Sequence, residues 1–506
     1  MTRSEKTQDH IIAFLSDPAT HGGETPQRIE THGAIVFLLS DRAYKLKRDV
    51  EYFFMDFSTI EKRRAACRNE VRLNRRTAPE LYHGTRAIID GPDGLALSDL
   101  DTNPAGTLDT VIEMARFENT FADVPPSDPE LRLVAETIAD FHDAEPALKG
   151  AGGSIPLGKT LSGNLTMLAQ EPTCDQDTVH QLKSAATDMI KRVSPLLDQR
   201  AADGSVRHCH GDLHLANICR WQGAPALFDC IEFNDAYAHI DVLYDLAFLL
   251  MDLGAHDRRD GAAIVFNRYL ERRPADIAGL SLLPLFLSMR AQVRAKVGYA
   301  AAAFDPAEKA ATRRATARDY LNRALGYLST KPPVLIAVGG PSGSGKSTIA
   351  RLLSPHIGAA PGALIARSDA IRKRLFNLKD ETERLPPGAY REPASIATYA
   401  EMERLCALAL SQGHSTIADA TFTHPDSRLR IEAIARKVGV PFIGIWLDLD
   451  EATATARVAG RTGDVSDATI QVVAQQFRNG WGEMTWQKIA ATDPTEDQVA
   501  AILKSL

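Results

Sequence analysis

The residues that could do chemistry gather in two stretches, and the first is a glycine-rich turn at residues 340–348. Its sequence, Gly-Pro-Ser-Gly-Ser-Gly-Lys-Ser-Thr, matches the pattern G-x-x-x-x-G-K-[ST] in full. Glycines let backbone N–H groups curl around an anionic phosphate without Cβ clashes. We expect Lys346 to reach the β- and γ-phosphates of ATP and Ser347 to ligate Mg²⁺. The predicted nucleotide contacts are Gly340, Ser342, Gly343, Ser344, Gly345, Lys346, Ser347 and Thr348.

The flanks of this turn support the interpretation. The apolar run at 334–338 predicts a buried strand, and the run at 349–353 predicts the start of a helix. Strand, turn and helix in this order are the context that the motif requires, and the helix N-terminus adds a partial positive charge. A glycine-rich turn with a chance lysine is the alternative, which the flanks disfavour.

The second stretch is a polar loop at residues 210–217, with the sequence His-Gly-Asp-Leu-His-Leu-Ala-Asn. A further acid, Asp229, follows beyond a predicted hairpin. Phosphoryl transfer needs such a set, with Asp212 accepting the hydroxyl proton while Asn217 and Asp229 hold Mg²⁺ through hard oxygen ligands. A polar turn with chance spacing is the alternative.

Charged residues upstream are arranged in the order that such a site requires. Residues 42–48 predict a strand that places Lys45 and Lys47 on one face, although two lysines on a strand face are also typical of a solvated surface. Residues 58–77 predict a helix that carries Glu70, with Ser58 as its N-cap. A glutamate on a helix is ordinarily surface charge, and only a partner lysine would make it functional.

Asp245 precedes an apolar helix that begins at Leu246. We expect it to be an N-cap or a brace for a neighbouring loop rather than a metal ligand.

Further acids follow the phosphate-binding turn. The predicted strand that begins at Ala363 ends at Asp369, and ligands of parallel sheets sit at the carboxyl ends of strands. Asp369 is therefore placed like a general base, with Arg372 one turn later as a substrate anchor. Alternatively, Asp369 only caps the helix. A buried strand from Ser415 ends at Asp419, which is expected on the Mg²⁺ side of the site.

Two arginines, Arg457 and Arg461, lie four residues apart and precede Thr-Gly-Asp. This spacing places both guanidinium groups on one helix face. Arginines on a mobile loop can cover the γ-phosphate and exclude water. A solvated basic helix face is the alternative.

The pattern His-Gly-Asp-x-His-x-x-Asn resembles the aminoglycoside phosphotransferase and choline kinase branch of the protein-kinase-like fold, over residues 25–325. The resemblance implies that Lys45, or Lys47 on the same face, pairs with Glu70 and the nucleotide phosphates. It also implies Asp212 as catalytic base, with Asn217 and Asp229 as magnesium ligands. The chain departs from the pattern in lacking G-x-G-x-x-G before Lys45, where only His32-Gly33 marks a turn.

Residues 334–506 resemble P-loop kinases that include gluconate kinase, polynucleotide kinase and zeta toxins. The segments Ser-Asp-x-Ile-Arg-Lys, Asp-Ala-Thr-Phe and Arg-x-x-x-Arg-Thr-Gly-Asp carry the resemblance. It implies that Asp369 activates the acceptor hydroxyl and that Arg457 and Arg461 belong to a lid. The order of the two halves resembles that of bacterial two-domain proteins.

A double proline, Pro332-Pro333, marks the domain boundary, because it stops a helix and forces an extended entry to the next strand. We predict an α+β, bilobal, protein-kinase-like domain over residues 1–330. An α/β P-loop domain with a parallel sheet is predicted over residues 331–506.

The composition of the 506 residues narrows the function. A net charge of −7 argues against nucleic acid as a general partner. The six cysteines form no C-x-x-C pair, and the first residues lack the apolar core of a signal peptide. The longest apolar runs are too short to span a bilayer. We therefore expect a cytoplasmic protein with no membrane partner.

The sequence as a whole predicts a bifunctional ATP-dependent kinase that phosphorylates small-molecule hydroxyl groups, with one ATP and Mg²⁺ site in each domain. Two alternatives stay open. One domain could be a kinase while the other binds ATP as a regulator. The P-loop domain could instead act as a toxin-like kinase on a nucleotide-linked acceptor.

Overall fold

The computed structural model describes residues 3–31, 33–52, 55–92, 94–102, 104–378, 383–460 and 469–505. The chain forms two compact units. Unit 1 comprises Met1–Leu133, Asp140–Pro156 and Arg200–Leu246, and unit 2 comprises Val134–Ala139, Leu157–Gln199 and Ala247–Leu506. The polar loop at 210–217 thus lies in unit 1 and the phosphate-binding turn in unit 2. The predicted domain boundary at residue 330 stays a prediction.

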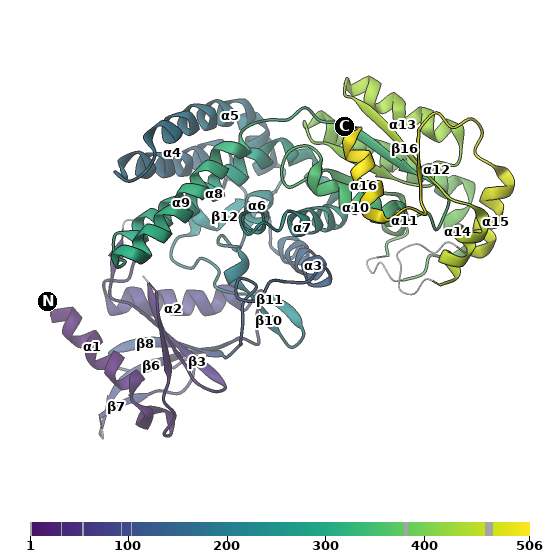
Figure 1. Ribbon diagram of the computed structural model, residues 1–506. Coiled ribbons are helices and arrows are strands. Elements are labelled where there is room, and N and C mark those ends of the chain that lie inside the picture. Colours follow the sequence, from purple (N-terminus) through teal and green to yellow (C-terminus); the bar gives the residue numbers. More distant parts are fainter. Residues whose placement is uncertain are drawn as a thin grey trace. The chain divides into compact units, whose positions relative to one another are not determined.

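Unit 1 is built on an antiparallel sheet, which has six strands in the described residues, in the order β1-β2-β3-β8-β6-β7 (Figure 1). The strands are β1 (Gln27–Glu30), β2 (Ala34–Leu38), β3 (Arg42–Lys47), β6 (Tyr82–Gly91), β7 (Gly94–Leu97) and β8 (Asp109–Ala115). A small ribbon, β4 (Glu51–Tyr52) with β5 (Met55–Asp56), leads from β3 to α2 (Ile60–Asn74). This mixed architecture agrees with the predicted α+β class.

Side-chain alternation gives β3 two different faces. Leu46 packs in one apolar cluster with Ile11 of α1 (Arg3–Ser16), whereas a second cluster joins Val71 of α2 to Ile112 of β8. Because successive strand residues point to opposite faces, the face that carries Lys45 and Lys47 turns toward α2. Ion pairs with Glu70 confirm this orientation, as described below.

The N-terminus of α2 differs from its prediction. Thr59 is the N-cap, and its Oγ1 accepts the backbone N–H of Lys62 at 3.3 Å. The hydroxyl of Ser58 instead donates to Asp56 at 2.6 Å. The prediction that Ser58 caps this helix is therefore wrong, because the helix begins one residue later and Thr59 holds the cap position.

Short elements frame the loop at 210–217. They are β9 (Val206–His208), paired with β12 (His239–Asp241), and β10 (Ile218–Trp221), paired with β11 (Ala224–Leu227), together with the 3₁₀ turns η2 (Leu215–Asn217) and η3 (Asp235–Tyr237). Both ribbons are antiparallel. The hairpin β10–β11 is the one predicted between Asn217 and Asp229, and it brings these residues back to the same region.

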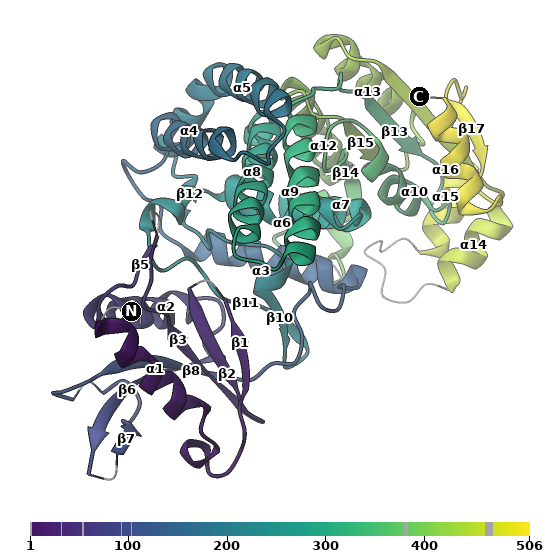
Figure 2. The ribbon, with the colours of Figure 1, turned by 60° about the vertical axis from the view of Figure 1, so that its left-hand side comes forward.

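Helices dominate the middle of the chain, where α8 and α9 pack side by side (Figure 2). These helices are α3 (Asp128–Ala144), α4 (Ser154–Gln170), α5 (Gln176–Ala202), α6 (Val242–Ala255), α7 (Arg259–Arg272), α8 (Leu283–Ala302) and α9 (Ala307–Tyr327), with the 3₁₀ helices η1 (Pro18–His21) and η4 (Pro274–Leu282) elsewhere in the chain. In the described residues, no helix is both long enough and apolar enough to cross a bilayer. In the residues that the structure describes, all six cysteines are buried, and none of them forms a disulfide.

The C-terminal part of unit 2 is a parallel sheet, with five strands in the described residues, in the order β14-β15-β13-β16-β17. Its strands are β13 (Leu335–Gly339), β14 (Leu364–Arg367), β15 (Thr416–Asp419), β16 (Phe442–Asp448) and β17 (Gln487–Ala490). The helical elements are α10 (Lys346–Leu353), η5 (Ser354–His356), α11 (Ser368–Leu375), η6 (Pro387–Tyr390), α12 (Glu392–Ser411), α13 (Pro425–Val438), α14 (Glu451–Ala459), α15 (Ile470–Asn479) and α16 (Thr495–Lys504). The parallel sheet agrees with the predicted P-loop fold.

Within unit 2, Asn267 of α7 completes the edge strand β14. Its Oδ1 accepts the backbone N–H of Ile365 at 2.6 Å, and its Nδ2 donates to the carbonyl of Ala363 at 3.2 Å. The same amide donates to the hydroxyl of Ser354 at 3.2 Å. One buried side chain thus satisfies the backbone on the open side of the strand.

Replacing this amide should destabilise unit 2. We expect Asn267→Ala to lower the free energy of unfolding by about 1–3 kcal/mol, because the backbone N–H of Ile365 loses its partner, whereas the carbonyl of Ala363 keeps the Ser354 hydroxyl at 2.7 Å. Urea denaturation followed by circular dichroism measures the change. The matched control is Asn322→Ala, an exposed position within α9. Equal midpoints for the two variants would contradict this account of β14.

Stability should also depend on the protonation of His414. Burial lowers the pKa of this imidazole from 6.5 to about 4, although its Nε2 lies 2.8 Å from the carbonyl oxygen of Gly362. The unfolded chain therefore takes up a proton at a pH where the folded chain does not. Stability should fall as the pH falls from about 6.5 to about 4, by roughly 3 kcal/mol in total.

Thermal unfolding at several pH values tests this dependence. His414→Gln should flatten the curve relative to the wild type, whereas His356→Gln, at an exposed position, should follow the wild type. A wild-type slope retained in His414→Gln would show that other groups cause it.

Candidate active sites

The loop at 210–217 is held from behind by Asp245, in the first turn of α6. Its Oδ2 accepts the backbone N–H of His210 at 3.1 Å, and its Oδ1 accepts that of Gly211 at 2.8 Å. Gly211 has φ of 85°, and a Cβ there would lie 3.0 Å from the carbonyl oxygen of Tyr237. A glycine is therefore required at this point. Of the two roles that the sequence left open for Asp245, it is the loop brace and not the N-cap, because α6 already begins at Val242.

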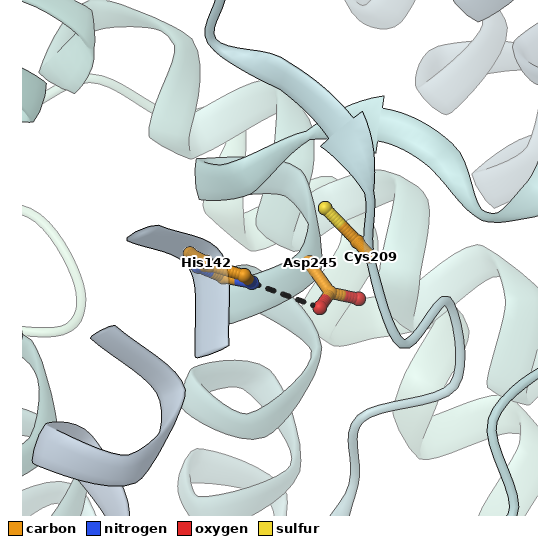
Figure 3. Close-up of side chains that lie close together, drawn as sticks. All are labelled: His142, Cys209 and Asp245. Carbon is orange, nitrogen blue, oxygen red and sulfur yellow. Dashed lines mark hydrogen bonds and ion pairs between the residues drawn. The ribbon is translucent and has the colours of Figure 1, made fainter. Parts of the chain in front are cut away.

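Behind the loop, Asp245 also meets a buried histidine from α3. Nε2 of His142 lies 3.1 Å from Oδ2 of Asp245, as Figure 3 shows, and Cys209 lies beside them. The thiol of Cys209 donates to the carbonyl of Ile240 at 3.5 Å. No motif in the sequence signals His142, because it lies far upstream in a helix without other chemistry.

Asp212 lies in this loop with its carboxylate oriented. Nδ2 of Asn217 donates to the backbone carbonyl of Asp212 at 2.9 Å and to its Oδ2 at 3.0 Å. Nε2 of His214 lies 3.4 Å from the same oxygen. The side chain of Asp212 is 37% exposed, so a substrate hydroxyl can reach it. An oriented, accessible carboxylate is what a general base requires.

Lys45 joins the helix glutamate to the second aspartate. Its Nζ lies 2.8 Å from Oε1 of Glu70 and 2.5 Å from Oδ1 of Asp229. Burial works against the charge of Lys45, but the two carboxylates outweigh it and raise the pKa of the amine well above its ordinary value. The solvated-face alternative is therefore wrong for this residue.

Lys47 has a different set of partners. Its Nζ contacts Oε2 of Glu70 and Oε1 of Glu232, and its side chain is 4% exposed. Of the two lysines that the sequence left open, Lys45 is the one that reaches Asp229. The sequence interpretation missed Glu232, although an acid three residues after Asp229 was the available signal.

Backbone strain presents Asp229 to the site. This residue has φ of 63°, its N–H donates to the hydroxyl of Tyr82 at 3.1 Å, and the next N–H donates to Oδ1 of Asn74 at 2.8 Å. A left-handed conformation at a residue other than glycine is uncommon and persists only when surrounding contacts hold it. Burial opposes its charge, yet Lys45 and Lys47 together hold the pKa of Asp229 below its ordinary value.

The oxygen donors of this site fit Mg²⁺. The carboxylate of Asp229 is 39% exposed and charged. Because Asp212 engages the amide nitrogen of Asn217, the amide oxygen is the atom that Asn217 can offer. Carboxylate and amide oxygens are the hard ligands that this ion prefers.

The phosphate-binding turn of unit 2 joins β13 to α10. Gly343 has φ of 91°, and a Cβ there would lie 2.8 Å from the carbonyl oxygen of Ala454. Lys346 is the first residue of α10, and its Nζ donates to the carbonyl of Pro341 at 2.9 Å. The lysine thus folds back along the turn, on the side where the motif places phosphates.

Ser347 and Asp419 meet at this turn. The Ser347 hydroxyl donates to Oδ2 of Asp419 at 2.6 Å, and Nε of Arg367 lies 3.8 Å from the same oxygen. Burial raises the pKa of Asp419, while Arg367, Lys346 and Ser347 oppose that shift. A serine hydroxyl beside a buried aspartate is the oxygen pair expected to hold Mg²⁺ in a P-loop site.

Asp369 lies in the first turn of α11, two residues beyond the end of β14. Arg367 pairs with Asp419 across β14 and β15, so Asp369 lies at the same carboxyl edge of the sheet. The N-cap of α11 is Arg367, which excludes Asp369 from that position. Arg372 is buried and donates to the carbonyl of Ala389 at 2.6 Å, so its role as a substrate anchor stays a prediction.

Arg457 approaches the turn from α14. Its Nη1 lies 3.4 Å from the carbonyl oxygen of Gly343, and its Nη2 donates to the carbonyl of Ala491 at 3.0 Å. Arg461 lies outside the described residues. The sequence interpretation missed Gln476 of α15, whose Oε1 accepts the N–H of Ser342 at 2.9 Å. No motif signals it.

Two family models match the chain, one in each half. Residues 38–283 match the phosphotransferase enzyme family, and residues 335–480 match an AAA domain. Uncharacterized proteins of Mycobacterium tuberculosis and Mycobacterium bovis are 29% identical over 489 residues, which is 93% of this chain and 93% of each relative.

Solved structures that match parts of the chain include two kinases. A gluconokinase from Sinorhizobium meliloti is 19% identical, covering 34% of this chain and 90% of its own, with a TM-score of 0.25. A choline/ethanolamine kinase family protein from Mesorhizobium loti is 14% identical, covering 64% of this chain and 99% of its own, with a TM-score of 0.37.

Removing the charge of Lys47 should destabilise unit 1. Lys47→Met leaves Glu232 buried without its cation, and breaking such a buried pair costs about 3–5 kcal/mol. Urea denaturation measures the loss. Lys62→Met is the control, because Lys62 pairs with Asp56 at the surface and should cost at most about 1 kcal/mol. Similar losses in both variants would contradict the importance of this buried cluster.

Proposed function

We propose that this protein is a bifunctional ATP-dependent enzyme with one ATP and Mg²⁺ site in each half. The chain joins a phosphotransferase-family domain to a P-loop kinase domain. Both halves would transfer phosphate to hydroxyl groups of small molecules. The observation that supports this proposal is that each half has its own oxygen donors beside its own lysine. Unit 1 brings Asp229 and Asn217 near Lys45, and unit 2 brings Ser347 and Asp419 near Lys346.

In unit 1, Asp212 would take the proton of the acceptor hydroxyl as the hydroxyl oxygen attacks the γ-phosphorus of ATP. The bond from this phosphorus to the bridging oxygen would break, and ADP would leave. Asn217 orients the Asp212 carboxylate, and the Asp245 brace fixes the backbone on which Asp212 stands. Glu70 holds Lys45 in position toward the phosphates. Mg²⁺ at Asp229 and Asn217 would neutralise phosphate charge.

In unit 2, backbone N–H groups of the turn and Lys346 would bind the phosphates. Asp369 stands at the same sheet edge as Asp419, which suits it as the base for a second acceptor. Arg457 reaches the turn itself and would contribute positive charge there, while Arg461 is proposed only from its place in the sequence.

Small hydroxyl compounds are the acceptor class that we propose for both sites. The net charge of −7 disfavours long polyanions such as nucleic acid, because their binding relies on released counterions and many basic contacts.

Separate site-dead variants of the full chain test bifunctionality. Asp212→Asn and Lys346→Met are each incubated with labelled ATP and a metabolite pool, beside the wild type. Each variant should lose a different set of labelled products, roughly a thousandfold, because each removes a group that acts on transferring phosphate or proton.

Matched controls are Asp9→Asn and Lys331→Met, both at exposed positions, which should label every product of the wild type. A single site-dead variant that loses all products would refute two independent activities and would favour a regulatory role for one half.

A further inference from the structure

Two histidines face each other beside the loop at 210–217, which we call the catalytic loop. β9 and β12 pair antiparallel with His208 directly opposite His239. The two rings lie edge to face, with centroids 4.7 Å apart. Directly opposed residues of an antiparallel pair place their side chains on the same side of the ribbon. The register of this ribbon therefore fixes two imidazoles next to each other.

A carboxylate completes the group. Asp235, at the start of η3, offers an oxygen that lies within 4.8 Å of a ring nitrogen of each histidine. These two ring nitrogens also lie within 4.8 Å of each other. Asn234 fixes the start of η3, because its side chain accepts the N–H of Ala236 at 3.0 Å. Asp235 is exposed and both histidines are half-buried, so an ion can enter from solvent.

The side chain of His208 is in a state that suits a metal ligand. Its Nε2 is buried without a hydrogen-bond partner among the described residues. Burial, and then the charges of Arg76 and His239, lower the pKa of His208 to about 4. The ring is therefore neutral near pH 7, which is the form that binds metal.

Two arginines lie near the group, and their charges favour the neutral form of His208. The guanidinium of Arg76 donates to the carbonyl of His208 at 2.7 Å and pairs with Glu145 at 2.9 Å. Arg72 is exposed, and its Nη2 donates to Asn69 at 2.6 Å. Asp235 supplies the opposing negative charge at the group itself.

The other cluster of metal-binding side chains is different. Both oxygens of Asp245 accept backbone N–H groups, Oδ2 also meets His142, and Cys209 donates to a carbonyl. Those atoms are already used to brace the loop. Among the described residues, the side chains of His208, Asp235 and His239 do not brace a loop in this way.

We propose that His208, Asp235 and His239 bind one divalent transition-metal ion of the zinc class. Two imidazoles and one carboxylate suit Zn²⁺, which accepts nitrogen and oxygen ligands and commonly keeps a water in a further position. Mg²⁺ prefers oxygen ligands, so this group would not compete for the ion of the phosphoryl-transfer site.

Such an ion would stiffen the catalytic loop. His208 lies four residues before Asp212, and the carbonyl oxygen of Tyr237 in η3 lies 3.0 Å from the place that a Cβ on Gly211 would occupy. An ion held by β9, η3 and β12 would tie together the elements that surround this loop. Metal binding should therefore raise the thermal stability of the folded protein.

Isothermal titration of tag-free, nucleotide-free protein with Zn²⁺, in excess Mg²⁺, tests the proposal. The wild type should bind one Zn²⁺ per chain. His208→Gln and His239→Gln should each weaken binding by at least about tenfold, since even changes outside the ligand shell often cost that much. The control is His256→Gln, which removes an exposed histidine 3.7 Å from Asp252 and should bind like the wild type.

Thermal unfolding without metal shows whether each variant folds. If a histidine variant does not fold, Asp235→Asn, which changes an exposed residue, is used in its place. Zinc should raise the unfolding temperature of the wild type and of His256→Gln only. Absence of a one-to-one site in the wild type would overturn the proposal. Unchanged affinity in His208→Gln, His239→Gln or Asp235→Asn would do so as well.

Discussion

The cost of taking charge out of water governs the arrangement of unit 1. Two lysines and three carboxylates form one cluster, and only Asp229 of the five keeps much contact with solvent. Each buried charge needs a partner at contact distance, since its desolvation costs several kcal/mol. Strand β3, helix α2 and the segment after β11 can therefore adopt only one mutual register. The carboxylate of this cluster that faces solvent is that of Asp229, where the proposed Mg²⁺ would bind.

Unit 2 solves the same electrostatic problem with backbone instead of side chains. The turn before α10 presents N–H groups, and the only carboxylate directly behind it in the described contacts, Asp419, is held by Ser347. Fewer charges must be buried, because peptide dipoles and one lysine supply the positive potential. The two halves thus supply positive charge by unrelated routes, and the two candidate sites share no residues.

The sequence was most informative where local geometry dictates residue type. The phosphate-binding turn, the acids at strand ends and the loop at 210–217 all have spacing that only a few backbones can satisfy. It was least informative where contacts join distant segments. Glu232 becomes a partner of Lys47, and His142 a partner of Asp245, only after the chain has folded. The Ser58 cap failed for a smaller reason, because the next residue, Thr59, occupies the N-cap position and accepts the N–H of Lys62.

The contact between Asn267 and β14 has a consequence for self-association. A strand at the edge of a sheet exposes backbone donors and acceptors that another chain can pair with. The amide of Asn267 imitates a peptide group of a neighbouring strand, since it accepts from Ile365 and donates to Ala363. Helix α7 thus acts as a cover for the open edge of the parallel sheet. A fragment that begins after α7 would expose this edge and become prone to aggregation, even if its own core were intact.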